Sequence, residues 1–311
     1  MPFNIGYLAA CITLLSWTVG TFAFTHASRE ANPSSVNRVR LLYALIVLSI
    51  LVMVFLKKTP WGLFESLVWQ QYFWFGLSGF VGLTLGDFFA FNAYRILGGR
   101  RTSLFSCFAP GAALLAGYFV LQENINTIGI MGMVLSIFGI LLLVASRKEQ
   151  QHVAAEGKGD FIKGIVFAAL GAIGQGVGLV LAKKGFSYSE PGFNPMYATW
   201  IRMLAAVVCV YAIGVFKVNV WTEFKGITFS GKKIRPILIG TLFGPVIGVS
   251  FSLLAASKLP ASVAQTIFSL LPASVLFAAV LFFKEKVPFK SYLAVIISII
   301  GVLVLVWRDQ F

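Results

Sequence analysis

Long apolar runs, separated by short polar stretches, follow one another along the whole chain. Ten of them are about 20 residues long, which is the length of helix that crosses roughly 30 Å of hydrocarbon. A membrane barrel would instead show segments of about ten residues in which apolar and polar positions alternate. We therefore predict an all-α integral membrane protein with ten transmembrane helices, at residues 3–24, 39–56, 72–94, 103–121, 128–145, 162–182, 198–216, 237–257, 263–283 and 291–307.

The composition also indicates a membrane protein. The chain has 58% hydrophobic and 12% charged residues and a mean hydropathy of +0.87, whereas soluble domains contain about 25% charged residues. The first apolar run lacks a basic start and a small-residue cleavage site, so we expect a retained helix. Lys and Arg outnumber Asp and Glu by 25 to 11. Because no polar stretch is long enough for a nucleic-acid-binding domain, this basic excess indicates contact with anionic headgroups of the lipid bilayer.

An internal repeat runs through the chain. When the sequence is shifted by 162 residues, residues that membrane helices use sparingly fall on one another without a gap. The coinciding pairs are Arg40 with Arg202, Gly82 with Gly244, Gly86 with Gly248, Pro110 with Pro272, Glu123 with Glu285 and Gly139 with Gly301. We predict two five-helix copies at residues 1–146 and 162–311, joined by a linker loop at 147–161. Five spans are an odd number, so the second copy must enter the membrane from the opposite side, as in the inverted repeats of secondary transporters.

Two stretches carry a resemblance to a known family. They are GDFFAFNAYRILGGRRTSLFSCFAPGAALLAGYFVLQENINTIGIMGMVLSIFGILLLV, which starts at Gly86, and LAASKLPASVAQTIFSLLPASVLFAAVLFFKEKVPFKSYLAVIISIIGVLVLV, which starts at Leu254. Each contains a helix with a proline, an apolar run that ends in Glu, and a last helix with a late glycine. The chain is similar to the EamA-type halves of the drug/metabolite transporter superfamily. This resemblance implies a ten-helix transporter of small metabolites, amino acids or drugs that is driven by gradients and not by ATP.

The residues give little support to other chemistry. There is no GxxxxGK[ST] loop for ATP, and Cys11, Cys107 and Cys209 lie in apolar runs without CxxC spacing. His26 and His152 lie in different loops, so we expect neither a metal site nor a cofactor. An enzyme would need a nucleophile and base, or metal ligands, that converge in the membrane. A membrane protein without transport, such as an assembly factor or an intramembrane enzyme, is therefore the less favoured alternative, as is a channel.

One acidic residue lies inside a predicted span. Asp87 precedes Arg95 by eight residues, which places it roughly 12 Å from that end of the helix, and a charge at this depth needs a partner inside the protein. Arg95 points about 80° away around the helix. Arg40, early in the second span, is the better partner. In the second copy Arg202 corresponds to Arg40, but Val249 stands in place of Asp87.

Because Val249 replaces the acid in the second copy, two interpretations remain open for Arg202 and two for Asp87. Arg202 is satisfied either by backbone carbonyls or by an anionic group of the substrate, a carboxylate or phosphate, for which a guanidinium is well shaped. Asp87 either locks two helices together with Arg40 or couples transport to protons. In the second hypothesis the acid takes up a proton when Arg40 moves away and releases it when Arg40 returns.

Glycine and proline positions predict where helices pack closely or bend. Two pairs, spaced by four residues on one helix face, allow a close approach of backbones: Gly82 with Gly86, and Gly244 with Gly248. Pro245 should kink the eighth span, and because its counterpart is Leu83, the kink should be asymmetric. Pro110 and Pro272 should bend the fourth and ninth spans and free carbonyls that line a cavity.

The remaining polar side chains near or within the spans have less specific predictions. Glu123 and Glu285 precede the last helix of each copy, and we interpret them as helix caps or loop locks. A direct part in ion or substrate binding is the less favoured alternative. The others are candidates for interhelical hydrogen bonds or for the pathway of substrate and protons: Asn92, Gln175, Gln265, Trp17 and Tyr94.

The loop charges predict an orientation in the membrane. Loops on the side of the N-terminus hold 6 Lys and Arg residues, and loops on the other side hold 16. The positive-inside rule then places both termini outside, whereas the family resemblance implies cytoplasmic termini. We expect a monomer or homodimer in a bacterial cytoplasmic membrane that moves a small-molecule substrate, with protons as the candidate coupling ion.

Overall fold

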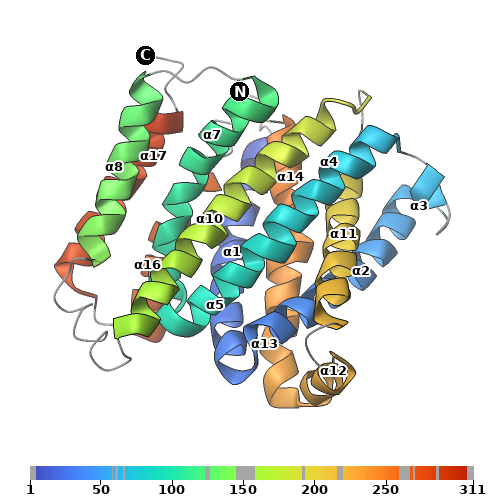
Figure 1. Cartoon of the computed structure of the whole chain (residues 1–311), viewed down its shortest axis with the longest axis horizontal. Coiled ribbons are helices and arrows are strands. Elements are labelled where there is room, and N and C mark those ends of the chain that lie inside the picture. Colours follow the sequence, from blue (N-terminus) through green and yellow to red (C-terminus); the bar gives the residue numbers. More distant parts are fainter. Residues whose placement is uncertain are drawn as a thin grey trace.

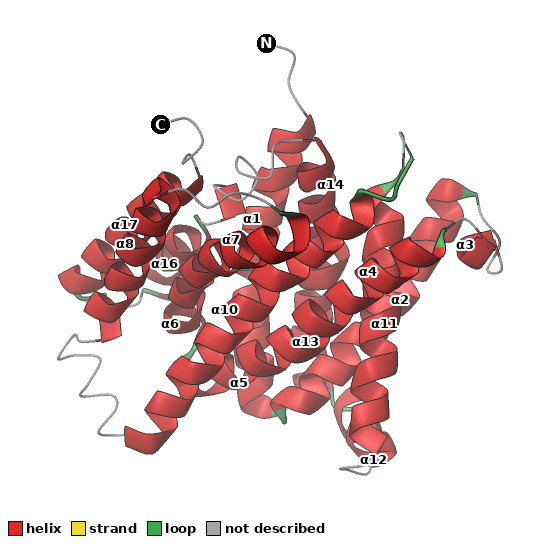
Figure 2. Ribbon diagram, turned by 45° about the horizontal axis from the view of Figure 1, so that its top comes forward, coloured by secondary structure: helices red, strands yellow, loops and turns green. Residues whose placement is uncertain are grey.

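The computed structural model describes residues 5–57, 59, 62–65, 67–122, 127–144, 158–190, 193–215, 220–258, 267–268, 270–284 and 287–306. Within these ranges the chain is helical and contains no strand (Figures 1 and 2). The helices are α1 Ile5–Glu30, α2 Pro33–Leu56, α3 Gly62–Glu65, α4 Trp69–Gly79, α5 Asp87–Leu97, α6 Gly99–Leu104, α7 Phe108–Leu121, α8 Thr127–Val144, α10 Lys158–Phe186, α11 Pro195–Val215, α12 Val220–Thr228, α13 Gly231–Thr241, α14 Ser250–Lys258, α16 Leu271–Phe283 and α17 Phe289–Val306. Two π-helical segments, η1 Phe80–Gly86 and η3 Leu242–Val249, and a 3-10 turn, η2 Phe105–Cys107, connect some of them.

The prediction of an all-α multi-pass membrane protein is confirmed. Seven helical segments of the described chain are long and apolar enough to cross a membrane. Three shorter apolar helices, Thr127–Gly139, Leu271–Phe282 and Phe289–Gly301, overlap the other three predicted spans. The count of ten spans therefore stays a prediction.

Two stretches predicted as loops are largely helical. Residues 25–38 hold only a two-residue connection, because α1 continues to Glu30 and α2 begins at Pro33. Asn32 caps α2 by accepting a hydrogen bond from Ser34 N at 3.0 Å, and a proline fits the first turn, where its missing N–H costs nothing. Residues 217–236, predicted as a linker, contain α12 and the start of α13.

The bounds of several helices in the two copies coincide, within one residue, when the chain is shifted by 162 residues. The run α4, η1 and α5 corresponds to α13, η3 and α14, and α8 corresponds to α17. The left-handed residues that end α7 and α16 also correspond, Gln122 at φ 58° and Lys284 at φ 52°. These matches support the duplication, while the opposite orientation of the copies stays a prediction.

The first helix of each copy packs against the other copy. Helix α10 contacts α4, η1, α5 and α7, whereas α1 contacts α13, η3 and α14. Helices α8 and α17 pack on each other at one edge of the bundle (Figures 1 and 2). The two π-helical segments therefore lie in the interior, between the copies.

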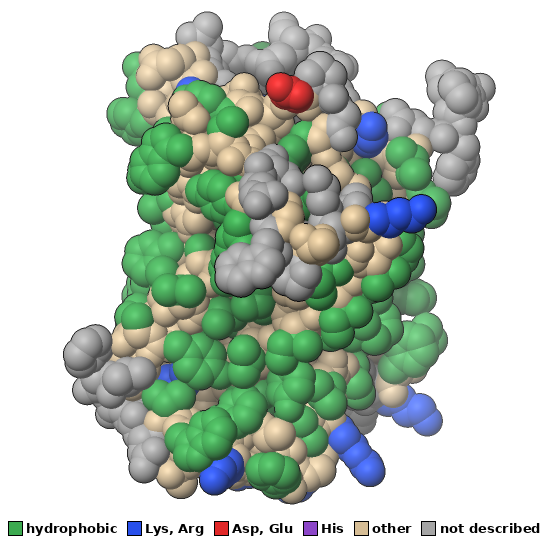
Figure 3. All heavy atoms as spheres, turned by 90° about the vertical axis from the view of Figure 1, so that its right-hand side faces the viewer, with side chains coloured by type: hydrophobic (Ala, Val, Ile, Leu, Met, Phe, Trp, Pro, Cys, Tyr) green, Lys and Arg blue, Asp and Glu red, His purple; other side chains and the backbone are tan. Residues whose placement is uncertain are grey.

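The outer surface is that of a membrane protein. On the face drawn in Figure 3, a broad belt of apolar side chains covers the middle, and Lys and Arg side chains lie mostly above and below it. Large side chains such as Phe55 and Phe119 are about 70% exposed, at 68% and 72%. Such exposure is expected of residues that face lipid tails.

Candidate functional site: a cavity between the two copies

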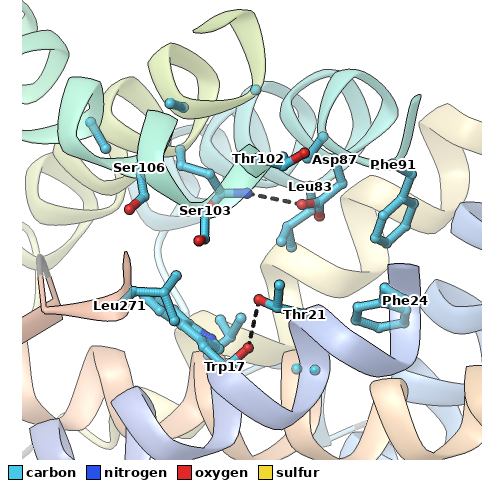
Figure 4. Close-up of a pocket in the computed structure, with 18 of the residues that line it drawn as sticks. Trp17, Thr21, Phe24, Leu83, Asp87, Phe91, Thr102, Ser103, Ser106 and Leu271 are labelled. Atoms are coloured by element: carbon cyan, nitrogen blue, oxygen red, sulfur yellow. Dashed lines mark hydrogen bonds between the residues drawn. The ribbon is translucent and has the colours of Figure 1, made fainter. Parts of the chain in front are cut away.

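A cavity of about 200 Å³ lies between the two copies. Helices α1, α2, α5, α6 and α7 with η1 and η2 line it from the first copy, and α10, α11, α14 and α16 with η3 from the second. In Figure 4, Thr102, Ser103 and Ser106 lie along one side of the cavity, while Trp17 and Leu271 face them from the other. The cavity therefore has both hydroxyl groups and a large apolar surface available to a solute.

The predicted ion pair between Asp87 and Arg40 is present in the wall of this cavity. Arg40 Nη2 donates to Asp87 Oδ2, and the two side chains are only 4% and 12% exposed. Asp87 is the first residue of α5, directly after η1. Arg40 lies two turns into α2, because α2 starts earlier than predicted.

Three further groups hold Arg40 in place. Its Nε donates to Asn37 Oδ1 at 2.9 Å, one turn earlier on α2. The rings of Phe24 and Phe91 lie on the guanidinium, with their centroids 5.4 and 4.9 Å from Cζ. Such cation–π contacts stabilise a cation that is removed from water. Asn37 was not predicted as part of the site, although it lies three residues before Arg40 and therefore on the same helix face.

Gln175 supplies the second partner of Asp87. This candidate residue lies on α10, in the other copy, and its Nε2 donates to Asp87 Oδ1 at 3.0 Å and to the Gly82 carbonyl at 3.2 Å. Both carboxylate oxygens of Asp87 are therefore engaged, one by each copy. The dashed line to Asp87 in Figure 4 marks this contact.

The equivalent arginine of the second copy has no such partners. Arg202 is 4% exposed and lines the cavity. Its Nε lacks a hydrogen-bond partner. A Cβ on Gly82 would be 3.3 Å from Arg202 Nη2, so the guanidinium lies beside η1 of the first copy.

The predicted close backbone approach is present at one of the two glycine pairs, Gly82 and Gly86. A Cβ on Gly174 would be 2.8 Å from Gly86 Cα, and a Cβ on Gly178 would be 3.0 Å from Gly82 Cα. The glycines of η3 instead receive aromatic rings of α1: Phe24 at Gly244 and Trp17 at Gly248. The glycines thus allow α10 and α1 to approach the two π-helical segments.

The three prolines lie in or beside irregular helical segments or at a helix start. Both η3, which contains Pro245, and η1, where Leu83 takes its place, are π-helical, so the wide turn itself does not depend on the proline. The asymmetric kink at Pro245 stays a prediction. Close packing at paired glycines is common to both segments. Pro110 lies inside the helical span Gly99–Leu121, shortly after its 3-10 segment η2. The predicted bends stay predictions, and Pro272 lies in the first turn of α16. A proline is tolerated there since the first N–H groups of a helix have no partner within it. Neither Pro110 nor Pro272 lines the cavity.

The other predicted site residues divide into three groups. Trp17 and Tyr94 line the cavity, and the Trp17 ring lies 5.4 Å from that of Phe268. Asn92 does not line it, because its side chain donates to the Phe88 carbonyl of its own helix at 2.7 Å. Outside the described residues are Gln265, Glu123, Glu285 and His152. The hydroxyl groups of Thr102, Ser103 and Ser106 in the cavity wall were not predicted, because Ser and Thr are also common in membrane helices that bind no ligand.

Cysteine and histidine positions show no grouping in the described ranges. The three cysteines are free thiols, and His26 is exposed near the end of α1. No group of three or more His, Cys, Asp or Glu residues is arranged to hold a metal ion in this part of the chain.

The similarity to known proteins identifies the chain. The model of the EamA-like transporter family matches residues 4–145 and 162–307. The chain belongs to this family. An uncharacterized transporter of Clostridium kluyveri is 26% identical to this EamA-like protein over 185 residues, or 59% of this chain and 56% of the relative. The chain thus aligns with little more than half of that relative's length.

The fold of this EamA-like protein also occurs in a solved structure. A crystal structure matches with a TM-score of 0.63 at 16% identity, over 98% of this chain and 99% of the other. At this identity the match shows the fold alone. The family match and the apolar helices together make the chain a multi-pass membrane protein of the EamA-like transporter family.

Proposed function

We propose that this protein is a secondary transporter that moves a small organic solute by alternating access. The cavity carries the proposal, because helices of both copies line it and buried polar groups lie in its wall. Two copies of opposite orientation, with ten spans in total, would open this cavity to one side of the membrane and then to the other as they rock. We further propose a monomer or homodimer in a bacterial cytoplasmic membrane, and transport without chemical change of the solute.

Reconstitution tests the transport proposal. Purified protein in proteoliposomes would be given a panel of radiolabelled amino acids, organic acids and amphipathic cations, with and without a proton gradient. We expect accumulation of at least one class above that in empty liposomes, and exchange when the same solute is present inside. Absence of both uptake and exchange for every class, at wild-type yield of folded protein, would favour the alternative of a membrane protein without transport.

We also propose that Asp87 couples this transport to protons. Its position in the cavity wall supports the idea, as does its contact with both copies through Arg40 and Gln175. Movement of one copy would break one of these contacts and change the affinity of the carboxylate for a proton. The rival hypothesis is a fixed structural link between helices and between copies.

The substitution Asp87→Asn separates the two hypotheses. Asn keeps an acceptor for Arg40 but cannot be charged, so coupling predicts folded protein that still exchanges solute and no longer responds to a proton gradient. Asp160→Asn removes the exposed carboxylate near the start of α10 and should leave the response unchanged. If Asp87→Asn kept gradient-driven accumulation at normal yield, the coupling proposal would be wrong; a much lower yield of folded protein would favour the structural link.

A further inference from the structure

The charges in the cavity wall do not cancel. Three charged side chains line it: Arg40, Asp87 and Arg202. Arg40 and Asp87 form an ion pair, so Arg202 leaves the wall with one uncompensated positive charge. A buried charge without a partner is unfavourable in a membrane protein, where such groups pair with one another or with a substrate.

Among the described residues that line the cavity, Asp87 is the acid, and it forms its salt bridge with Arg40. Its two oxygens accept from Arg40 and Gln175. The Arg202 guanidinium lies beside Gly82 in η1, where an added Cβ would be 3.3 Å from Nη2, and the Gly82 carbonyl accepts from Gln175. Since Arg202 is 96% shielded from solvent, with 4% exposure, and its Nε has no partner, the site is built to receive an anion from the cavity.

One free guanidinium selects the charge and shape of the ligand. A planar fork of N–H donors binds a carboxylate through two parallel hydrogen bonds. The uncompensated charge is a single one, so a monoanion neutralises the cavity whereas a dianion leaves an excess negative charge. An amino acid would also bring an ammonium group and so add a positive charge to a cavity wall that already has an excess of one.

The remainder of the wall suits an apolar body. The tilted pair of Trp17 and Phe268, together with Leu271, forms one side of the cavity, and Ser103 and Ser106 bring hydroxyls to the opposite side (Figure 4). A volume of about 200 Å³ is below the roughly 300 to 1,000 Å³ of sites for drug-sized ligands. The solute is therefore smaller than a typical drug.

We infer that the cavity binds a small apolar monocarboxylate, whose carboxylate pairs with Arg202 while its aromatic or branched body lies against Trp17. This inference rests on the proposed function, because it names the class of solute that the transporter would carry.

Calorimetric titration of the purified full chain in nanodiscs of zwitterionic lipid tests the inference. The probes are phenylacetate, its neutral analogue phenylacetamide, phenylalanine and inorganic phosphate. A charge-assisted hydrogen bond contributes about 1.5 to 3 kcal/mol, which corresponds to roughly 10 to 100-fold in affinity. We expect wild-type protein to bind phenylacetate 10 to 100-fold more tightly than phenylacetamide, and more tightly than phenylalanine or phosphate.

Substitution of Arg202 tests whether this residue causes the preference for the acid over the amide. Arg202→Gln should bind phenylacetate 10 to 100-fold more weakly and change phenylacetamide binding less than about threefold. Arg202→Lys should retain part of the preference, and Arg95→Gln, an exposed arginine outside the cavity, should retain all of it. Because the comparison of acid and amide on wild-type protein needs no variant, a poorly folded Arg202→Gln would not prevent the test.

The outcomes distinguish this inference from the proposed function. Equal binding of acid and amide by wild-type protein, tighter binding of phosphate or phenylalanine, or an unchanged preference in Arg202→Gln would each overturn the inference. If proteoliposomes transport a cation or a neutral solute that phenylacetate does not inhibit, transport stands and the inference fails. If phenylacetate binds through Arg202 but no solute of the panel is moved, the inference stands and the proposed function fails.

Discussion

Two arginines at equivalent positions of the repeat have opposite surroundings. Arg40 has a carboxylate, an amide oxygen and two aromatic rings around it, while the Nε of Arg202 has no partner. The replacement of an acid by Val249 in the second copy accounts for part of this difference. One copy thus contains a complete polar network and the other a free cation, and a solute bound between them would meet an asymmetric wall.

Another buried ion pair connects α2 with α12 away from the cavity. Arg38 Nη2 donates to Glu223, and Ser35 donates to the same carboxylate; the two charged side chains are 7% and 26% exposed. We predict that Arg38→Gln lowers the free energy of unfolding by about 1 to 3 kcal/mol, because it leaves Glu223 partly buried without its cation. Thermal or denaturant unfolding in one detergent measures the change.

The exposed pair Lys163 and Asp160 is the matched control. Lys163 Nζ lies 3.6 Å from Asp160 Oδ1, and the two side chains are 68% and 63% exposed. Water screens the attraction in such exposed pairs. Lys163→Gln should therefore unfold like the wild type. A double-mutant cycle of Arg38→Gln with Glu223→Gln should show coupling between the two positions, whereas additive effects would show that the pair does not connect α2 to α12.

At the scale of elements, the two π-helical segments shape the cavity. Each interrupts a long helix, η1 between α4 and α5 and η3 between α13 and α14, and each contributes cavity-lining residues. π-helical turns are rare and often occur at functional sites. Because η1 and η3 also contact the first helix of the opposite copy, a relative movement of the copies would act directly on the cavity wall.

The contact between α10 and η1 should tolerate no added side chain. A Cβ on Gly174 would lie 2.8 Å from the backbone of Gly86, so Gly174→Ala forces the helices apart. We predict a loss of about 1 to 3 kcal/mol in the free energy of unfolding, the usual cost of overpacking. Gly226→Ala in α12 is the control, because its Cβ would meet nothing within 4 Å, and alanine raises helix stability by up to about 1 kcal/mol. Equal thermal stability of the two variants would contradict the close contact.

The sequence predicted the apolar spans well, because hydropathy marks them, and predicted the polar helix ends and the π-helical turns poorly. The apolar runs located the spans, but the polar ends of α1 and α2 were assigned to a loop, because side chains such as Arg29 and Arg38 interrupt the apolar pattern without ending the helix. The wide turn at Leu83 has no proline to signal it. Close packing between distant helices produces it, and one sequence does not reveal which helices meet.

At the scale of the whole molecule, the repeat made the most specific prediction. The shift of 162 residues aligns the bounds of several helices, such as α4 with α13 and α8 with α17, and also the left-handed residues Gln122 and Lys284. Asp87 is the one acidic residue inside a predicted span, and its distance from the end of that span was enough to predict its pairing with Arg40. The contact with Gln175 could not be predicted, because it joins the two copies and depends on how they pack, and the cavity hydroxyls lacked any distinguishing pattern.

The orientation in the membrane follows from charge alone and is the remaining whole-molecule prediction. Figure 1 shows α12 at one end of the bundle and the turn between α10 and α11 at the other. The end with α12 belongs to the side whose loops hold 16 Lys and Arg residues, against 6 on the other side. Since positively charged loops are retained in the cytoplasm, we predict that α12 is cytoplasmic and that both termini are outside.

Cysteine labelling in intact cells tests this orientation. Phe229 follows α12 and is 83% exposed, and Tyr188 follows α10 and is 41% exposed, so each accepts a reporter cysteine without entering the core. In a variant whose three native cysteines are replaced by Ala or Ser, Tyr188→Cys should react with a membrane-impermeant maleimide from outside, and Phe229→Cys should react only after permeabilisation. The reverse pattern would place the termini in the cytoplasm and would mean that the basic loops, including Lys232 and Lys233 at the start of α13, do not determine the orientation.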